Sequence, residues 1–161
     1  EDMIPVYEDE NKRVHIIAGE YKDLEGEITR KDTKPVFLDI ELEANSEFIF
    51  ELDYEFNSYA FLIRGEANFD QEEEDFITYP QGVLYDRGDK IRVNTKDKSA
   101  RFLLLAGEKL NEPIAWGGPI VMNTRKELKI ASRDLKEDNF VKEKSKKDIE
   151  EINDFYHEEN N

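Results

Sequence analysis

The sequence contains no cysteine. This excludes disulfide bonds, thiolate metal sites and cysteine nucleophiles together, and it suits a reducing compartment. No apolar run approaches the roughly 20 residues that a membrane span requires, and no charged-then-apolar N-terminal segment resembles a signal peptide. We therefore expect a cytoplasmic protein that does not enter a membrane.

Histidine is also scarce, because the chain holds only His15 and His157, near its opposite ends. Metal sites in small β-barrels usually combine two or three imidazoles with a carboxylate, a donor set that suits iron, copper and zinc. Neither histidine has a ligand-like neighbour spacing, so we expect a structural role for both and no metal or other cofactor in this chain. No G-x-S-x-G, Walker loop or G-x-G-x-x-G occurs, and no spacing distinguishes a catalytic pair among the 39 acidic residues. No catalytic residue is predicted.

Basic residues are fewer than acidic ones, 23 against 39, and the formal net charge is −16. Such a chain repels phosphates and anionic lipid, and no basic patch offsets the repulsion, so direct nucleic-acid binding is not expected. The acidic run at 72–75 lacks the alternating oxygen ligands and the glycine of a calcium loop. We interpret it as a solvated hairpin tip.

Alternating apolar and polar residues dominate the first two thirds of the chain, and ten Phe and seven Tyr provide a core. The clearest segment places Val36, Leu38, Ile40 and Leu42 on one face, as in a half-buried antiparallel strand. Together with the turn signals between them, these segments predict an all-β sandwich or barrel. The expected strands are 13–20, 35–44, 47–53, 58–69, 76–79, 83–85, 90–94 and 102–106.

The period then changes from two to about 3.6. Thr124 and Glu127 have the spacing of a capping box, and a second cap of the same kind begins at Ser145. We therefore expect one or two C-terminal helices. The expected organisation is an N-terminal arm or linker at 1–12, a β-barrel at 13–123 and a helical segment at 124–161.

The stretch at 101–123 combines the most apolar strand with a loop that holds two prolines, the only tryptophan and two adjacent glycines. The unbroken apolar run predicts a strand buried on both faces. In the loop, Glu112 is either a reactive carboxylate or a cap for backbone amides, and we favour the cap. Trp116 is either a binding anchor or an apolar plug, and Asn123 is placed for local backbone hydrogen bonds. These three are candidate structural or interface residues.

A small-molecule ligand inside the barrel is a further possibility. Bulky apolar residues on the expected strands are its candidate lining: Phe50, Tyr59, Phe61 and Leu103. Whether the cavity is open or packed shut does not follow from the sequence.

A run at 103–128 resembles the C-terminal signature of the pirin family. It has a glycine after an apolar strand, an E-P-I turn, the segment G-P-I-V-M-N and a helix capped by threonine. RVHIIAG at 13–19 and YDRGD at 85–89 resemble other parts of the same domain. The resemblance covers residues 14–140 and implies a cupin-type antiparallel β-barrel, a double-stranded jelly roll.

Pirins are two-domain proteins whose iron site, three histidines and a glutamate, lies in the N-terminal cupin domain and supports a quercetin dioxygenase-like activity in several members. The resemblance here is to the C-terminal domain, and none of those ligands can be carried over. It implies a domain that is non-catalytic by itself and has a structural or partner-binding role, its partner being the N-terminal cupin domain or another protein. The alternative is one half of a metal-dependent quercetin 2,3-dioxygenase-like enzyme whose iron is held by the other domain.

Overall fold

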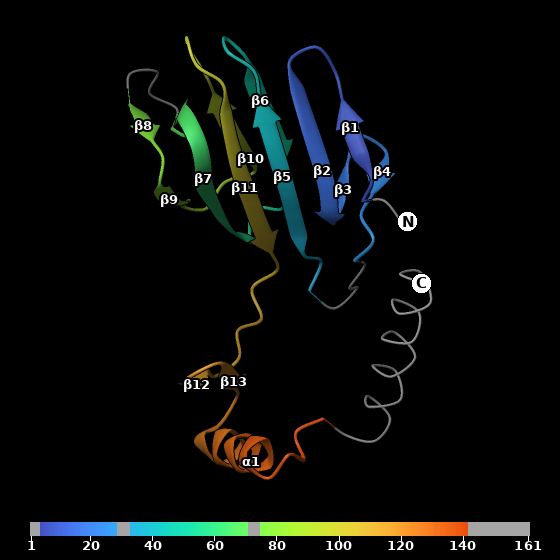
Figure 1. Cartoon of the computed structure of the whole chain (residues 1–161), viewed down its shortest axis with the longest axis vertical. Helices are drawn as coiled ribbons and strands as arrows, with labels where there is room; N and C mark the ends of the chain where they lie inside the picture. Colours follow the sequence, from blue (N-terminus) through green and yellow to red (C-terminus); the bar gives the residue numbers. More distant parts are fainter. Residues whose placement is uncertain (1–3, 29–32, 71–74, 142–161) are drawn as a thin grey trace, which may run out of the picture. The chain divides into compact units, whose positions relative to one another are not determined.

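The structure is a computed structural model that describes residues 4–28, 33–70 and 75–141. Two compact units divide the chain, Glu1–Leu110 and Asn111–Asn161. The first is made of antiparallel strands, and the second combines a short hairpin with a helix (Figure 1). The prediction of an all-β domain followed by a helix is therefore confirmed.

One curled sheet forms the first unit. Its strands follow the spatial order β1 (Val6–Glu8), β2 (Lys12–Ala18), β5 (Val36–Leu42), β11 (Ala100–Gly107), β7 (Asn57–Asn68), β10 (Lys90–Asn94) and β6 (Glu47–Glu51). Two more strands pair with β7, namely β8 (Phe76–Thr78) and β9 (Gln81–Leu84). A separate small hairpin joins β3 (Glu20–Tyr21) and β4 (Leu24–Glu25). In Figure 1 the pair β6 and β10 lies behind β5, β11 and β7, so the sheet folds over into two layers.

The fold-over depends on β7, the longest strand. Its first part pairs with β11 and β9, and its last residues pair with β8 and β10. Gly65 lies at the change of partners with φ +83°, and just before it the pairing with β11 shifts register, between Leu62 and Arg64 on β7 and between Phe102 and Arg101 on β11. A side chain at Gly65 would place its Cβ 2.0 Å from the Ser99 carbonyl oxygen. The bend therefore requires glycine, because only glycine allows both this φ and this backbone approach.

Apolar side chains fill the space between the two layers. The predicted face of β5 is buried there in full, and Phe102 and Leu104 of β11 join it. Phe102 contacts Phe48 and Phe69 edge to face at ring distances of 5.7 and 5.4 Å. Offset and edge-to-face aromatic contacts of this kind add to the burial of apolar area. The interior is consequently packed shut in its middle.

The second unit holds β12 (Ala115–Gly117), β13 (Ile120–Met122) and α1 (Arg125–Lys136). The predicted capping box is present, since the Thr124 hydroxyl accepts from the Glu127 amide at 3.2 Å and the Glu127 carboxylate accepts from the Thr124 amide at 2.8 Å. Ala115, Ile120 and Ala131 are buried within this unit. The second predicted helix, from Ser145, lies outside the described residues, as do residues 72–74 of the acidic run at 72–75.

Three expectations need correction. Val6–Glu8 is not an arm, because it pairs with β2 as the edge strand β1. The barrel does not extend to 123, because the segment after Leu110 pairs with itself as β12 and β13 and belongs to the second unit. Finally, β11 buries only one face: Phe102 and Leu104 point inward, whereas Leu105 remains 38% exposed. An apolar run cannot report this difference, since it lacks the alternation that marks a solvated face.

Candidate functional site

Apolar side chains also gather on the outer face of the sheet. In antiparallel strands directly opposed residues share a face, and Leu105 opposes both Phe37 and Tyr59, Tyr59 opposes Leu84, and Leu103 opposes Phe61. Leu84 is 79% exposed and Tyr59, Phe61 and Leu105 are 36–38% exposed. We call this set the outer patch: Phe37, Tyr59, Phe61, Leu84, Leu103 and Leu105.

A depression of about 420 Å³ adjoins the outer patch. Phe37, Tyr59, Leu84 and Leu105 line it, together with residues at the start of β5 and β7. An apolar surface with a hollow in it can receive a protruding side chain from another protein, which is the usual anchor of a protein interface.

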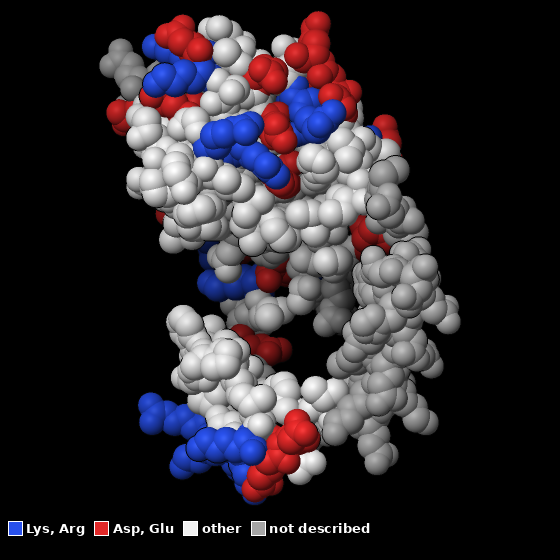
Figure 2. Space-filling model, in the orientation of Figure 1, with Lys and Arg blue, Asp and Glu red and all other residues white. Residues whose placement is uncertain are grey.

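Charged residues border the outer patch along the strands. Arg101 donates two hydrogen bonds to the Asp39 carboxylate, at 2.9 and 2.6 Å, and Arg64 pairs with Glu41 at 3.4 Å. The bonds and the charge of Asp39 raise the pKa of the Arg101 guanidinium, which therefore remains charged. Figure 2 shows charged side chains over the upper part of this face and a mainly uncharged area below them. An apolar centre beside polar, ion-paired residues is the composition of a protein-binding face.

The predicted cavity lining is wrong for three of its four residues. Tyr59, Phe61 and Leu103 lie together on the outer face, because their neighbours Ala60, Leu62, Phe102 and Leu104 occupy the inner one. Only Phe50 faces the interior. The sequence analysis also missed Phe37, Leu84 and Leu105. Phe37 could have been found, because it lies between Val36 and Leu38 on the strand whose inner face was predicted correctly.

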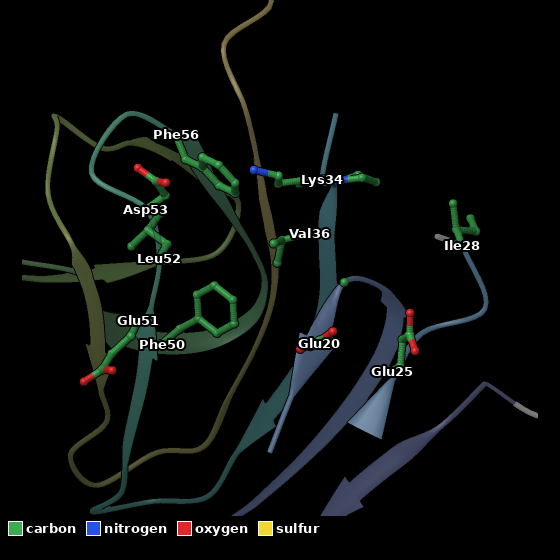
Figure 3. Close-up of a pocket in the computed structure, with 12 residues that line it drawn as sticks. Glu20, Glu25, Ile28, Lys34, Val36, Phe50, Glu51, Leu52, Asp53 and Phe56 are labelled. Carbon is green, nitrogen blue, oxygen red and sulfur yellow. The ribbon is translucent and has the colours of Figure 1, made fainter. Parts of the chain in front are cut away.

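Phe50 lines a second cleft, of about 560 Å³, at one end of the sheet. Its walls come from the end of β6 and the following loop, from the β3–β4 hairpin, and from the start of β5 (Figure 3). The cleft lies wholly within the first unit. No residue of the predicted loop at 112–123 contributes to it.

The loop candidates are placed in the second unit. The Asn123 amide donates to the Glu112 carboxylate at 2.6 Å and to the Pro113 carbonyl oxygen at 3.4 Å. Glu112 thus accepts from a side chain, where we expected backbone amides. Trp116 is 77% exposed, and its indole N–H donates to the Gly118 carbonyl oxygen at 2.8 Å. It is not a plug, and with its cross-strand partner Val121 it forms a second exposed apolar surface.

The histidines of this chain do not match the iron ligand set of three histidines and a glutamate, because the sequence contains only two. His15 is on β2 between the inward-facing Val14 and Ile16, so it points to the outer face, opposite Asp39. His157 lies outside the described residues. Among the residues that the structure describes, no group of three or more His, Asp or Glu side chains could hold a metal ion. Within the same residues, no helix is long and apolar enough to cross a bilayer.

A curled antiparallel sheet folded into two layers is the architecture of cupin domains. Residues 37–141 match the family described as the Pirin C-terminal cupin domain, which is more than half of the chain. The chain therefore belongs to the pirin family through this domain, and the predicted family and cupin-type fold are confirmed.

Named relatives agree with this assignment. A pirin-like protein of Solanum lycopersicum is 29% identical over 132 residues, covering 81% of this chain and 45% of the relative. Pirin of Homo sapiens is 28% identical over 138 residues, covering 84% and 47%. The crystal structure of a quercetin 2,3-dioxygenase from Acinetobacter baumannii superposes with a TM-score of 0.72 at 25% identity, covering 83% of this chain and 45% of that one. The chain thus spans about half the length of these relatives.

Proposed function

We propose that this chain is the partner-binding cupin domain of a pirin-like protein and is non-catalytic by itself. The observation that carries the proposal is the outer patch, an apolar surface on an otherwise strongly acidic domain. Exposed contiguous apolar surfaces beside polar residues mark interaction sites on soluble proteins. Without cysteines the domain suits a reducing compartment, and we place it in the cytoplasm.

The occupant we favour is a second cupin domain. The chain matches only about half of each curated relative, so those proteins carry a comparable length of chain beside the matching domain. A domain of that size can cover the outer patch and insert a side chain into the depression between Phe37, Tyr59 and Leu105. Tyrosine and leucine on a rigid sheet lose little conformational entropy on binding, which favours a stable contact.

A direct test is to titrate the chain with the separately expressed N-terminal half of the Solanum lycopersicum relative in a calorimeter. Leu105→Glu places a carboxylate at the centre of the outer patch and should weaken binding at least about tenfold, since an unpaired charge would be desolvated. The matched control is Ile49→Glu on β6, an exposed apolar residue on the other layer, which should bind normally. Equal effects of the two variants, or self-association of the chain through the outer patch alone, would contradict the proposed occupant.

The alternative function is one half of a quercetin 2,3-dioxygenase-like enzyme, favoured by the structural similarity to the Acinetobacter baumannii enzyme. In that case this domain walls a site whose metal is held elsewhere, because only two histidines occur in the chain. Metal analysis of the purified chain and oxygen uptake with a flavonol separate the two functions. Stoichiometric iron or copper with oxygen uptake in the chain alone would overturn the non-catalytic assignment.

A further inference from the structure

The cleft at the end of the sheet has the properties of a binding site for a small molecule. Its volume of about 560 Å³ lies within the range of ligand pockets, roughly 300–1,000 Å³. It opens between two walls, with the start of β5 at its base (Figure 3). It shares Ile28, Pro35 and Val36 with the depression beside the outer patch, but its apolar wall is different, because Phe50 belongs to the buried core.

Apolar side chains form one wall and the base. Phe50, Leu52 and Phe56 come from β6 and its loop, and Val36 comes from β5. Phe50 is held by the stacked ring of Tyr21, with centroids 6.5 Å apart. The loop is held by two backbone hydrogen bonds, from the Leu52 amide to the Asp89 carbonyl oxygen and from the Phe56 amide to the Asp53 carbonyl oxygen, each 3.0 Å. The wall is therefore preformed.

The opposite wall is equally fixed. The Gly26 amide donates to the Gly19 carbonyl oxygen at 2.8 Å and the Ile28 amide donates to the Ile17 carbonyl oxygen at 3.2 Å. A Cβ at Gly26 would lie 2.8 Å from the Ala18 nitrogen, so the β3–β4 hairpin packs directly on the backbone of β2. This rigid hairpin carries two carboxylates, Glu20 and Glu25.

The charged side chains that line the cleft indicate which class of ligand it binds. Glu20 and Glu25 oppose each other directly across the β3–β4 pair, where two like charges repel. Glu51 and Asp53 also border the cleft, but Glu51 pairs with Lys90 at 3.9 Å and Asp53 accepts from the Glu55 amide at 3.1 Å, so Glu20 and Glu25 carry the negative charge of this site. Among the lining residues that the structure describes, Lys34 is the one cation. Lys34 also faces Glu108, with 3.6 Å between its Nζ and the carboxylate. A cation bound beside Glu20 and Glu25 would relieve the repulsion between them.

We propose that this cleft binds an amphipathic organic cation, a molecule with an ammonium group and an apolar body. The ammonium lies against Glu20 and Glu25, and the apolar body covers Phe50 and Phe56. Aromatic faces attract cations as well as apolar groups, so the two halves of the ligand cooperate at this wall.

Three probes that share a phenyl group on a four-carbon chain and differ in their polar end group test the proposal: 4-phenylbutylamine, 4-phenylbutanol and 4-phenylbutanoate. Each is titrated into the purified chain while the backbone amide shifts of Gly19, Val36 and Leu52 are followed by NMR. The amine should bind about tenfold more tightly than the alcohol, and the carboxylate should bind most weakly. Added salt should weaken the binding of the amine and of neither other probe, because only the amine is attracted by the charges of the cleft.

The double variant Glu20→Gln, Glu25→Gln should lower the affinity for the amine about tenfold and leave the affinity for the alcohol unchanged. Its control is Glu10→Gln, Glu43→Gln, which removes the same charge from two exposed carboxylates outside the cleft. Phe56→Ala should weaken amine and alcohol alike. Equal affinities for amine and alcohol, equal effects of the two double variants, or no shift at millimolar amine would each overturn the proposal.

Discussion

The two faces of β11 differ although both are apolar. Phe102 and Leu104 pack against the second layer and have no exposed surface, whereas Leu105, the next residue, is 38% exposed on the outer face. The same strand thus contributes to the core on one side and to the outer patch on the other. The inner side chains are buried because the sheet folds over on itself, and the outer ones remain partly exposed.

The difference teaches that apolar content alone does not define a core. Burial by the chain's own second layer stabilises the fold, and exposure of similar residues leaves free energy available for binding. The two faces should therefore respond differently to the same substitution.

The largest expected difference is between adjacent leucines. Leu104→Ala should lower the free energy of unfolding by about 3 kcal/mol, because it removes a buried side chain and leaves a cavity, whereas Leu105→Ala should cost less than about 1 kcal/mol. Urea unfolding followed by circular dichroism measures both. Similar losses for the two variants would mean that the outer face is covered within the isolated chain.

Burial of Tyr21 in the core should make the folded protein less stable at alkaline pH. Burial raises the pKa of Tyr21 to about 12, and the charges of Tyr7 and Asp9 add to the shift. The unfolded phenol titrates near pH 10. Because the folded state favours the neutral phenol, this contribution to stability is complete below about pH 10 and is lost as the pH rises toward 12.

Tyr21→Phe should reduce the loss of stability across this interval, measured by urea unfolding at a series of pH values. Tyr54→Phe is the control, because Tyr54 is 54% exposed. Some alkaline loss should remain in the Tyr21 variant, since burial also raises the pKa of Tyr85. An unchanged profile in Tyr21→Phe would place its hydroxyl in water in the native state.

The smallest effect should come from the ion pair that borders the outer patch. A double-mutant cycle of Arg101→Ala and Asp39→Ala should give a coupling free energy of about 0.5–1 kcal/mol, since the contact is bidentate and partly buried. The more exposed Arg13–Glu8 pair, at 2.9 Å, is the comparison and should couple less. Equal coupling free energies in the two cycles would show that partial burial does not strengthen the Arg101–Asp39 ion pair.

Sequence patterns predicted most of the individual elements. The inner residues of β5 followed from alternation, and the start of α1 followed from the spacing of Thr124 and Glu127. The strands β1, β12 and β13 were missed because of their surroundings: β1 lies in a charged N-terminal segment, and β12 and β13 lie in a stretch rich in Pro and Gly, a composition that indicates a loop. The two-residue strands β3 and β4 carry no alternation to recognise.

Placement of the candidate site was harder to predict. Tyr59, Phe61 and Leu103 were selected together and do lie together, but on the outer face. A period of two divides a strand into two sets of residues without stating which set faces the interior, and when both sets are apolar no local signal decides. The cleft was missed for a related reason, since Phe50 and Glu25 meet only through the fold-over of the sheet.

By itself the sequence determined the main strands of the sheet, the capped helix, the acidic charge and the family, because each depends on residue type and local spacing. The tertiary structure alone decided which apolar face became the core, where the outer patch lies and which carboxylates surround the cleft. These features arise from the bend at Gly65 and from pairings between residues far apart in the chain, and such contacts leave no trace in the local pattern.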